Sequence, residues 1–317
     1  MNSSHSGFAR SIALLALWPL LLNPLLAQKP GANAGLPKVP VWETTKPGSA
    51  GTVYLVGSIH MMTEKEYPLP APFDEAFEQS SRILFEAPME TMAKPETQLK
   101  MMEMMTLPEG KTIKTELSGP THNALVKAIK KSSLSTNLPR MERFHPAFLT
   151  MMLTLSQIQK AGGSSAHGLD IHFYKKAVKA NKTLGALETW DYQMNALKEL
   201  GTTEGEKLVT STLKQLEKTD NYFKNVLTAW KNGDSAKLAT LLEEGNDEFP
   251  ALHETLILKR NQAWLPQIEK LYTGPTHSMV IVGAGHLVGK GSLLDLLKAK
   301  GITAVQQAGV PRAVVVP

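Results

Sequence analysis

The chain has 317 residues, of which 42% are hydrophobic and 20% are charged, and it contains no cysteine. An apolar fraction of this size supplies a hydrophobic core, which excludes a disordered chain. The lack of cysteine excludes disulfide frameworks, zinc fingers, iron–sulfur clusters and thiol nucleophiles. Any metal ion must therefore be held by His, Asp or Glu side chains. The net charge of +5 is mild and requires no acidic partner.

Residues 1–27 have the pattern of a secretory signal peptide. Arg10 precedes an apolar run from Ser11 to Ala27, and a small residue stands at the expected cleavage site. The run is short for a membrane span, and Pro19 and Pro24 interrupt it. We therefore expect cleavage near Ala27, export to the periplasm or the medium of a bacterium, and no stable membrane insertion afterwards.

The first part of the mature chain predicts a linker followed by strands. Residues 28–40 are rich in Pro, Gly and Ala, which is typical of a linker. Short apolar runs predict strands at 41–45, 52–57 and 82–86, and the turn residues at 46–51 join the first two as a hairpin. A helix is predicted to begin at Phe73.

The remaining chain predicts a long helical middle between terminal strands. Apolar residues recur at helical spacing from about 90 to 267, with one short strand predicted at 182–187. The predicted helices of this region include 121–130, 146–160, 171–180 and 205–229. A strand at 277–283, a helix at 291–300 and a strand at 301–305 end the chain. We expect one α/β (α+β) domain over 41–317, with a central mixed sheet of N- and C-terminal strands and a large helical insertion.

One short pattern occurs twice. The strands that end at Gly57 and Gly283 are each followed by the sequence Gly-x-x-His, which places His60 and His286 just beyond a strand. Glycine permits a sharp turn there, and ligands gather at the carboxyl ends of strands in open α/β sheets. The two imidazoles converge if the two strands are neighbours. A single Gly-x-x-His is common, but its repetition after two buried strands favours a functional site over a paired structural role.

A carboxylate is expected at the same edge of the sheet, because Glu86 is the last residue of the predicted strand 82–86. Two imidazoles and one carboxylate are a typical open ligand set for a catalytic divalent metal ion. Glu86 would then be either a third ligand or a general base, and the sequence leaves both roles open.

Several ordered motifs resemble those of the TraB/PrgY/GumN family, whose animal relatives are the Tiki metalloproteases. The motifs cover nearly the whole mature chain and are Trp42, Tyr54-Leu-Val-Gly-Ser-Ile-His60, Phe85-Glu86, Gly168-Leu-Asp170, Leu187-Glu188-Thr189 before Gln193, Arg260-Asn261 with Trp264, and Val282-Gly-Ala-Gly-His286. The resemblance, to a GumN-type bacterial member, implies a fold shared with erythromycin-esterase-like and ChaN-like proteins.

The resemblance also implies an activity and the residues for it. In the Tiki branch it implies a metal-dependent hydrolase that uses His60, Glu86 and His286, with Mn, Co or Zn as candidate metals. A metal-activated water would attack the carbonyl of a peptide or small-molecule ester. Arg260 could stabilise an oxyanion or a substrate carboxylate, or could form a helix-surface ion pair.

Four further residues are secondary candidates. Gly57 and Gly283 shape the two strand ends, whereas Asp170 and Glu188 match family motifs and are also explained by helix capping or a buried salt bridge. Interspersed charges give no support for nucleic-acid binding, and Gly-x-Ser-x-Gly is missing from the sequence. The alternative to an enzyme is a non-catalytic metal-, haem- or peptide-binding protein of the same fold.

Overall fold

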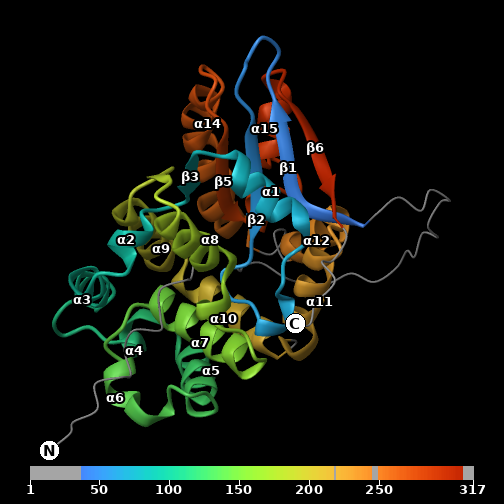
Figure 1. The fold of residues 1–317 in the computed structure, drawn as a ribbon. Coiled ribbons are helices and arrows are strands. Elements are labelled where there is room, and N and C mark those ends of the chain that lie inside the picture. The colour runs from blue at the N-terminus through green and yellow to red at the C-terminus, as the bar shows by residue number, and fades with distance from the viewer. Residues whose placement is uncertain (1–36, 218, 245–248, 310–317) are drawn as a thin grey trace, which may run out of the picture.

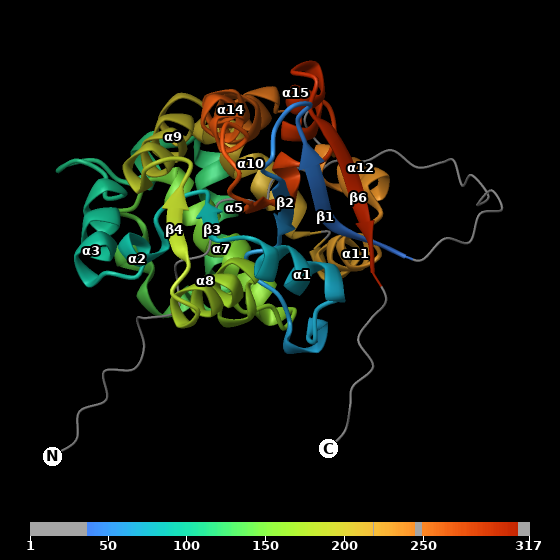
Figure 2. The ribbon, with the colours of Figure 1, turned by 45° about the horizontal axis from the view of Figure 1, so that its top comes forward.

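The computed structural model describes residues 37–217, 219–244 and 249–309. The predicted signal peptide and most of the predicted linker lie outside these residues. Within them, six strands form one mixed sheet in the order β4-β3-β5-β2-β1-β6 (Figures 1 and 2). N- and C-terminal strands build this sheet around a large helical middle region, which confirms the predicted fold class.

The strands follow the predicted ones closely. Their bounds are β1 Lys38–Thr45, β2 Val53–Ser58, β3 Arg82–Phe85, β4 Thr183–Ala186, β5 Ser278–Gly283 and β6 Thr303–Ala308. The predicted hairpin of β1 and β2 is antiparallel, β6 pairs antiparallel with β1, and β2, β5, β3 and β4 run parallel. Parallel strands share one edge at their carboxyl ends, so whatever follows β2, β3 and β5 is brought together.

The first strand begins earlier than the sequence predicts. β1 takes in residues 38–40, which were expected to belong to the linker, because Val39 is buried against the core. The register against β6 shifts between Lys38 and Trp42, and Pro40 lies within this irregularity. Proline has no N–H to donate and is therefore excluded from regular ladders, but this irregularity tolerates it.

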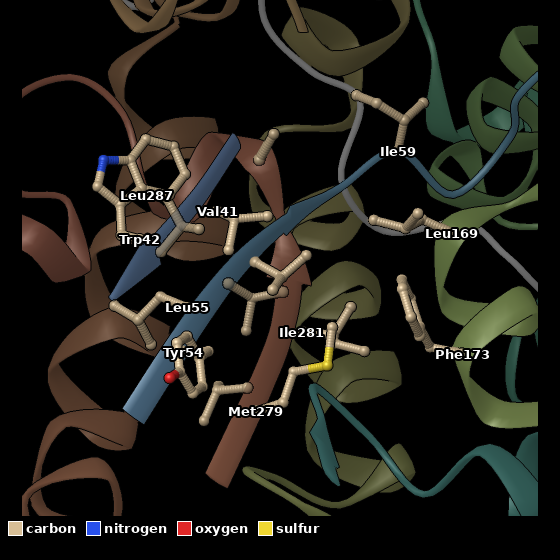
Figure 3. Packing of buried hydrophobic residues seen from close by; sticks show 14 of the residues in the cluster. Val41, Trp42, Tyr54, Leu55, Ile59, Leu169, Phe173, Met279, Ile281 and Leu287 are labelled. Carbon is tan, nitrogen blue, oxygen red and sulfur yellow. The ribbon is translucent and has the colours of Figure 1, made fainter. Parts of the chain in front are cut away.

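Helices cover both faces of the sheet (Figures 1 and 2). Those packed on or beside it are α1 Ala71–Gln79, α8 Leu169–Lys179, α11 Thr219–Lys231, α12 Ser235–Glu243, α14 Lys259–Leu271 and α15 Leu293–Ala299. Aromatic contacts from Phe73 to Phe173 and Trp230 join α1, α8 and α11 on one face. Helices α14 and α15 lie on the other face. Figure 3 shows the resulting division, with Met279 and Ile281 on the side of Phe173, and Leu55 with Leu287 on the opposite side.

A second hydrophobic cluster lies within the helical middle region. The remaining helices are α2 Met89–Met92, α3 Pro95–Met104, α4 Ile113–Glu116, α5 Gly119–Lys130, α6 Leu138–Met141, α7 Pro146–Lys160, α9 Trp190–Thr203, α10 Gly205–Leu216 and α13 Pro250–His253. Among these, α5, α7, α9 and α10 bury Leu125, Phe148, Leu197 and Leu208 together. Met92 packs against both this cluster and the sheet core.

The prediction of a single helix over 205–229 is wrong, because the structure has two helices there, α10 and α11. Leu208 of α10 belongs to the cluster of the middle region, whereas Phe223 and Trp230 of α11 pack in the sheet core. One straight helix does not reach both cores, so the chain breaks between them. In the described ranges no helix combines the length and the apolar character that crossing a membrane requires.

Candidate functional site

The carboxyl ends of β2, β3 and β5 meet at one edge of the sheet, with β5 between the other two. Ser58 at the end of β2 pairs with Gly283 at the end of β5, and Phe85 of β3 pairs with Ile281. His60 follows β2 by two residues, and Glu86 follows β3 directly.

His286 lies in the short 3₁₀ turn η5 (Ala284–His286) after β5. The structure brings His60, Glu86 and His286 together. The Nε2 atom of His60 lies 4.0 Å from Glu86 Oε1, and the Nε2 atom of His286 lies 3.7 Å from the same oxygen. The three residues are 9%, 6% and 0% exposed, so the cluster is nearly closed to solvent.

A hydrogen bond at Nδ1 orients each imidazole. His60 Nδ1 lies 2.7 Å from Asp170 Oδ2, an oxygen that also accepts from the Ser58 hydroxyl at 2.6 Å. His286 Nδ1 lies 2.7 Å from Asn261 Oδ1. Since both partners are oxygen acceptors, each Nδ1 is the donor. In the neutral ring this leaves the Nε2 lone pair of each histidine directed into the cluster, an arrangement typical of metal-binding histidines.

Arg260 stands at the centre of the site and is only 1% exposed. Its Nη2 donates to Glu86 Oε2 at 2.5 Å and to Glu188 Oε1 at 2.8 Å, and its Nε donates to Glu188 at 3.0 Å. Its Nη1 donates to the Leu256 carbonyl at 2.9 Å and lies 3.2 Å from His286 Nε2. The guanidinium is therefore a buried ion-pair partner of two carboxylates and does not lie at a helix surface.

A local irregularity positions this arginine. Residues Glu254–Leu258 form a π-helical turn, η4, immediately before α14. Wider turns of this kind leave carbonyl groups without their usual partner and often occur at functional sites. The Leu256 carbonyl within the turn accepts from Arg260, which fixes the guanidinium against the strand ends.

Glu86 is held by donors on both oxygens. Its Oε1 accepts from the Gly283 N–H at 2.6 Å, and its Oε2 accepts from Arg260 and from Gln193 Nε2 at 3.2 Å. Burial alone would raise the pKa of this carboxyl, but Arg260, the two imidazoles and the Gly283 amide outweigh burial and lower the pKa to about 2. Glu86 is therefore a fixed anion.

The site shifts the pKa values of the two histidines in opposite directions. Burial and Arg260 lower the pKa of His286 to about 3 against the opposing effect of Glu86, so its imidazole is neutral. Burial also opposes the charged form of His60, but the carboxylates of Asp170 and Glu86 outweigh it and raise the pKa to about 9. The region around His60 thus favours an added positive charge.

The charge balance of the cluster explains this preference. Glu86, Asp170 and Glu188 are three buried carboxylates, and Arg260 is the single guanidinium among them, which leaves a formal charge of −2 when both imidazoles are neutral. The Nε2 atom of His60 is buried and has no hydrogen-bond partner. Buried charges in proteins are paired or bind metals.

The imidazole and carboxylate donors of this cluster are of types that bind divalent cations. The donor atoms of these side chains, however, do not converge on one point. Across the described ranges, no group of three or more His, Asp or Glu side chains is arranged so that it could hold a metal ion. Gly283 and Arg260 occupy both Glu86 oxygens, and Arg260 also faces His286 Nε2, so these contacts have to loosen for a cation to be bound.

The sequence of the chain matches the pattern of the TraB/PrgY/gumN family over residues 40–306. The chain belongs to this family. Among proteins similar to it, the uncharacterized protein YbaP of Shigella flexneri and that of Escherichia coli K12 are each 26% identical over 259 residues, which cover 82% of this chain and 92% of the relative. An uncharacterized protein of Treponema pallidum is 22% identical over 92% of both chains. No solved structure matches the chain significantly.

Three residues of the TraB/PrgY/gumN motifs have contacts in the site that were not predicted. Asn261 binds His286, Gln193 binds Glu86, and the Trp264 indole N–H donates to Glu188 Oε2 at 2.7 Å. Arg260 and its neighbour Asn261 lie one turn before Trp264 on the buried face of α14. Polar residues on an otherwise buried helical face are the sequence feature that could have indicated them.

The secondary candidates lie at the same site. Asp170 binds His60, and Glu188 forms the ion pair with Arg260 described above. Gly283 supplies an N–H to Glu86, and the Gly57 carbonyl accepts from the Trp230 indole at 2.7 Å. A side chain at Gly57 would lie 3.3 Å from Ala284 Cβ, so this glycine lets the ends of β2 and β5 approach each other.

Proposed function

We propose that this member of the TraB/PrgY/gumN family is an exported, metal-dependent hydrolase that cleaves a peptide or ester bond. The observation that supports this most is the buried cluster, which has a formal charge of −2 when both imidazoles are neutral and contains an unpartnered His60 Nε2. His60, Glu86 and His286 would hold the cation. When bound, a divalent cation would lower the pKa of a water molecule toward neutrality and so supply the nucleophile.

The residues of the chain around this cation have separate tasks in the proposal. Asp170 and Asn261 orient the two imidazoles so that Nε2 faces Glu86. Arg260 positions Glu86 and keeps it ionised, because its donors are engaged by Glu86, Glu188 and the Leu256 carbonyl. A carboxyl whose pKa is about 2 is a weak base near neutral pH, which favours the ligand role of Glu86 over the general-base role.

The test is a hydrolysis screen of the mature protein. Peptide and ester substrates are offered to protein loaded in turn with Mn²⁺, Co²⁺ or Zn²⁺, to protein treated with a chelator, and to His60→Ala and His286→Ala variants. The proposal expects turnover by loaded wild-type protein and loss of turnover in the other three samples. Activity that survives both substitutions would contradict it.

Non-catalytic metal binding is the second candidate, and the burial of the site favours it. His286 and Arg260 are at most 1% exposed, so a substrate carbonyl reaches the cluster only after neighbouring segments move. If the wild-type protein binds a cation but turns over none of the substrates in the screen, the result would favour this candidate.

A further inference from the structure

A concave site lies beside the segment that follows His60. It is a pocket of about 530 Å³ between the 3₁₀ turn η1 (Glu64–Glu66), the carboxyl end of α7 and one side of α11. Lys65, Lys160, Lys224 and Lys231 line it, so each of the three segments contributes at least one ammonium group. None of these lysines takes part in the cluster at the strand ends.

Helix α11 presents a continuous stripe to this pocket. Lys224, Leu227, Thr228 and Lys231 line it and are spaced by three and four residues, which places them on one helical face. Leu227 and the neighbouring Phe223 are 7% and 3% exposed and form an apolar floor. The pocket therefore combines a low-dielectric wall with a rim of positive charge.

Only one of the four charges is balanced. Lys231 pairs with Glu66 at 3.1 Å, and the other oxygen of Glu66 accepts from the Thr63 hydroxyl at 3.2 Å. In the part of the chain that the structure describes, the ammonium groups of Lys65, Lys160 and Lys224 have no carboxylate within ion-pair distance. Three unbalanced positive charges thus surround the pocket.

We propose that this pocket binds a compact multivalent anion of the phosphate class. A cleft lined by charges of one sign with apolar walls concentrates the electrostatic field and attracts ligands of the opposite sign. Lysine binds phosphate groups as a point charge, and the volume lies in the range of small-molecule sites. This binding requires neither the metal ion nor the bond cleavage proposed for the strand ends.

The experiment is a calorimetric titration of the mature protein with pyrophosphate. The test variant is K160E/K224E, and the matched control is K127E/K130E, which makes the same charge change at exposed lysines of α5. Both pairs of lysines are exposed, so neither variant disturbs the core. We expect saturable binding to wild-type protein that weakens ~10-fold or more in K160E/K224E and is unchanged in K127E/K130E.

Two further arms distinguish binding in this pocket from binding at the strand ends and from binding to a lipid surface. Binding that is unchanged in His60→Ala separates the pocket from the metal site, because pyrophosphate could also bind to a metal ion. Cosedimentation with phosphatidylcholine vesicles, with and without phosphatidic acid, distinguishes a free phosphate from a lipid headgroup. Equal weakening in the two lysine pairs, loss of binding in His60→Ala alone, or no saturable binding of either probe would overturn the proposal.

Discussion

The backbone N–H of Gly283 donates to Glu86 Oε1 at 2.6 Å, so the end of β5 fixes the carboxylate that follows β3. Because β5 lies between β3 and β2, this bond also sets the position of Glu86 relative to both histidines. Gly283 has φ −50° and ψ 136°, a conformation open to any residue, so it is the backbone amide that makes this contact and not the lack of a side chain. The cluster is therefore anchored to the ends of the strands.

Removing the buried guanidinium of Arg260 should destabilise the fold strongly. In Arg260→Met the carboxylates of Glu86 and Glu188 lose their shared buried partner, which should lower the free energy of unfolding by about 3–5 kcal/mol. The matched control is Lys100→Met, whose pair with Asp191 is exposed and should contribute only about 0–1 kcal/mol. Urea denaturation of both variants measures the difference, and equal losses would contradict the central role of Arg260.

Removing the partner of His286 should weaken both metal binding and the fold. Asn261→Leu leaves the Nδ1 proton without an acceptor in a fully buried position, which should cost about 1–3 kcal/mol of stability. It also frees the ring to change tautomer, so metal affinity should fall roughly 10–100-fold if His286 is a ligand. Titration calorimetry with Zn²⁺ measures the affinity. Unchanged affinity would mean that His286 Nε2 does not bind the cation.

A close backbone contact makes Gly168 sensitive to substitution. A Cβ at this position would overlap the His60 carbonyl oxygen, which is a backbone atom with little room to move. Gly168→Ala should therefore push the start of α8, and Asp170 with it, away from His60, at a cost of about 1–3 kcal/mol. Gly119→Ala is the control, because a Cβ there meets nothing within 4 Å. The thermal unfolding midpoint of Gly168→Ala should lie below that of Gly119→Ala, and similar midpoints would contradict the expected overlap.

His145, which lies outside the site, should make the free energy of unfolding depend on pH. Its ring is buried before α7, and burial together with Lys198 lowers its pKa to about 4 from 6.5. The unfolded chain therefore binds a proton at His145 that the folded chain excludes. The stability linked to this residue is complete above pH 6.5 and is lost as the pH falls toward 4.

His145→Gln should remove that component, because glutamine does not titrate. Urea midpoints measured between pH 4 and 7 should fall less steeply on acidification in His145→Gln than in wild-type protein. Carboxylates elsewhere contribute equally to both proteins, so the difference in slope isolates His145. Parallel curves would show that the buried ring is not protonated more readily in the unfolded chain.

The positions of the three site residues at strand ends could be predicted from local sequence. Gly-x-x-His after an apolar strand, as at His60 and His286, and a carboxylate directly after the strand, as at Glu86, are short patterns that a single sequence displays. Their convergence required β2, β3 and β5 to be neighbours. Strand order depends on pairing between segments far apart in the chain, such as Val53 with Ser278 and Arg82 with Ser278, which local patterns do not encode.

The surroundings of the site were harder to predict. The contacts of Arg260 depend on a π-helical turn, and a search for helical periodicity does not detect such a turn. Asn261 and Gln193 are neutral amides whose importance comes from the groups they meet, not from their own chemistry. Likewise, the break between α10 and α11 reflects two separate cores rather than a helix-breaking residue in the predicted run.

Calorimetric titration of metal-free protein with Mn²⁺, Co²⁺ and Zn²⁺ tests most directly whether the strand-end cluster holds a divalent cation. The unpartnered His60 Nε2 and the buried charge, which is −2 when both imidazoles are neutral, predict one bound cation per chain, with binding lost in His60→Ala. Binding of none of the three cations, or binding of equal strength in His60→Ala, would contradict a metal site at the ends of β2, β3 and β5.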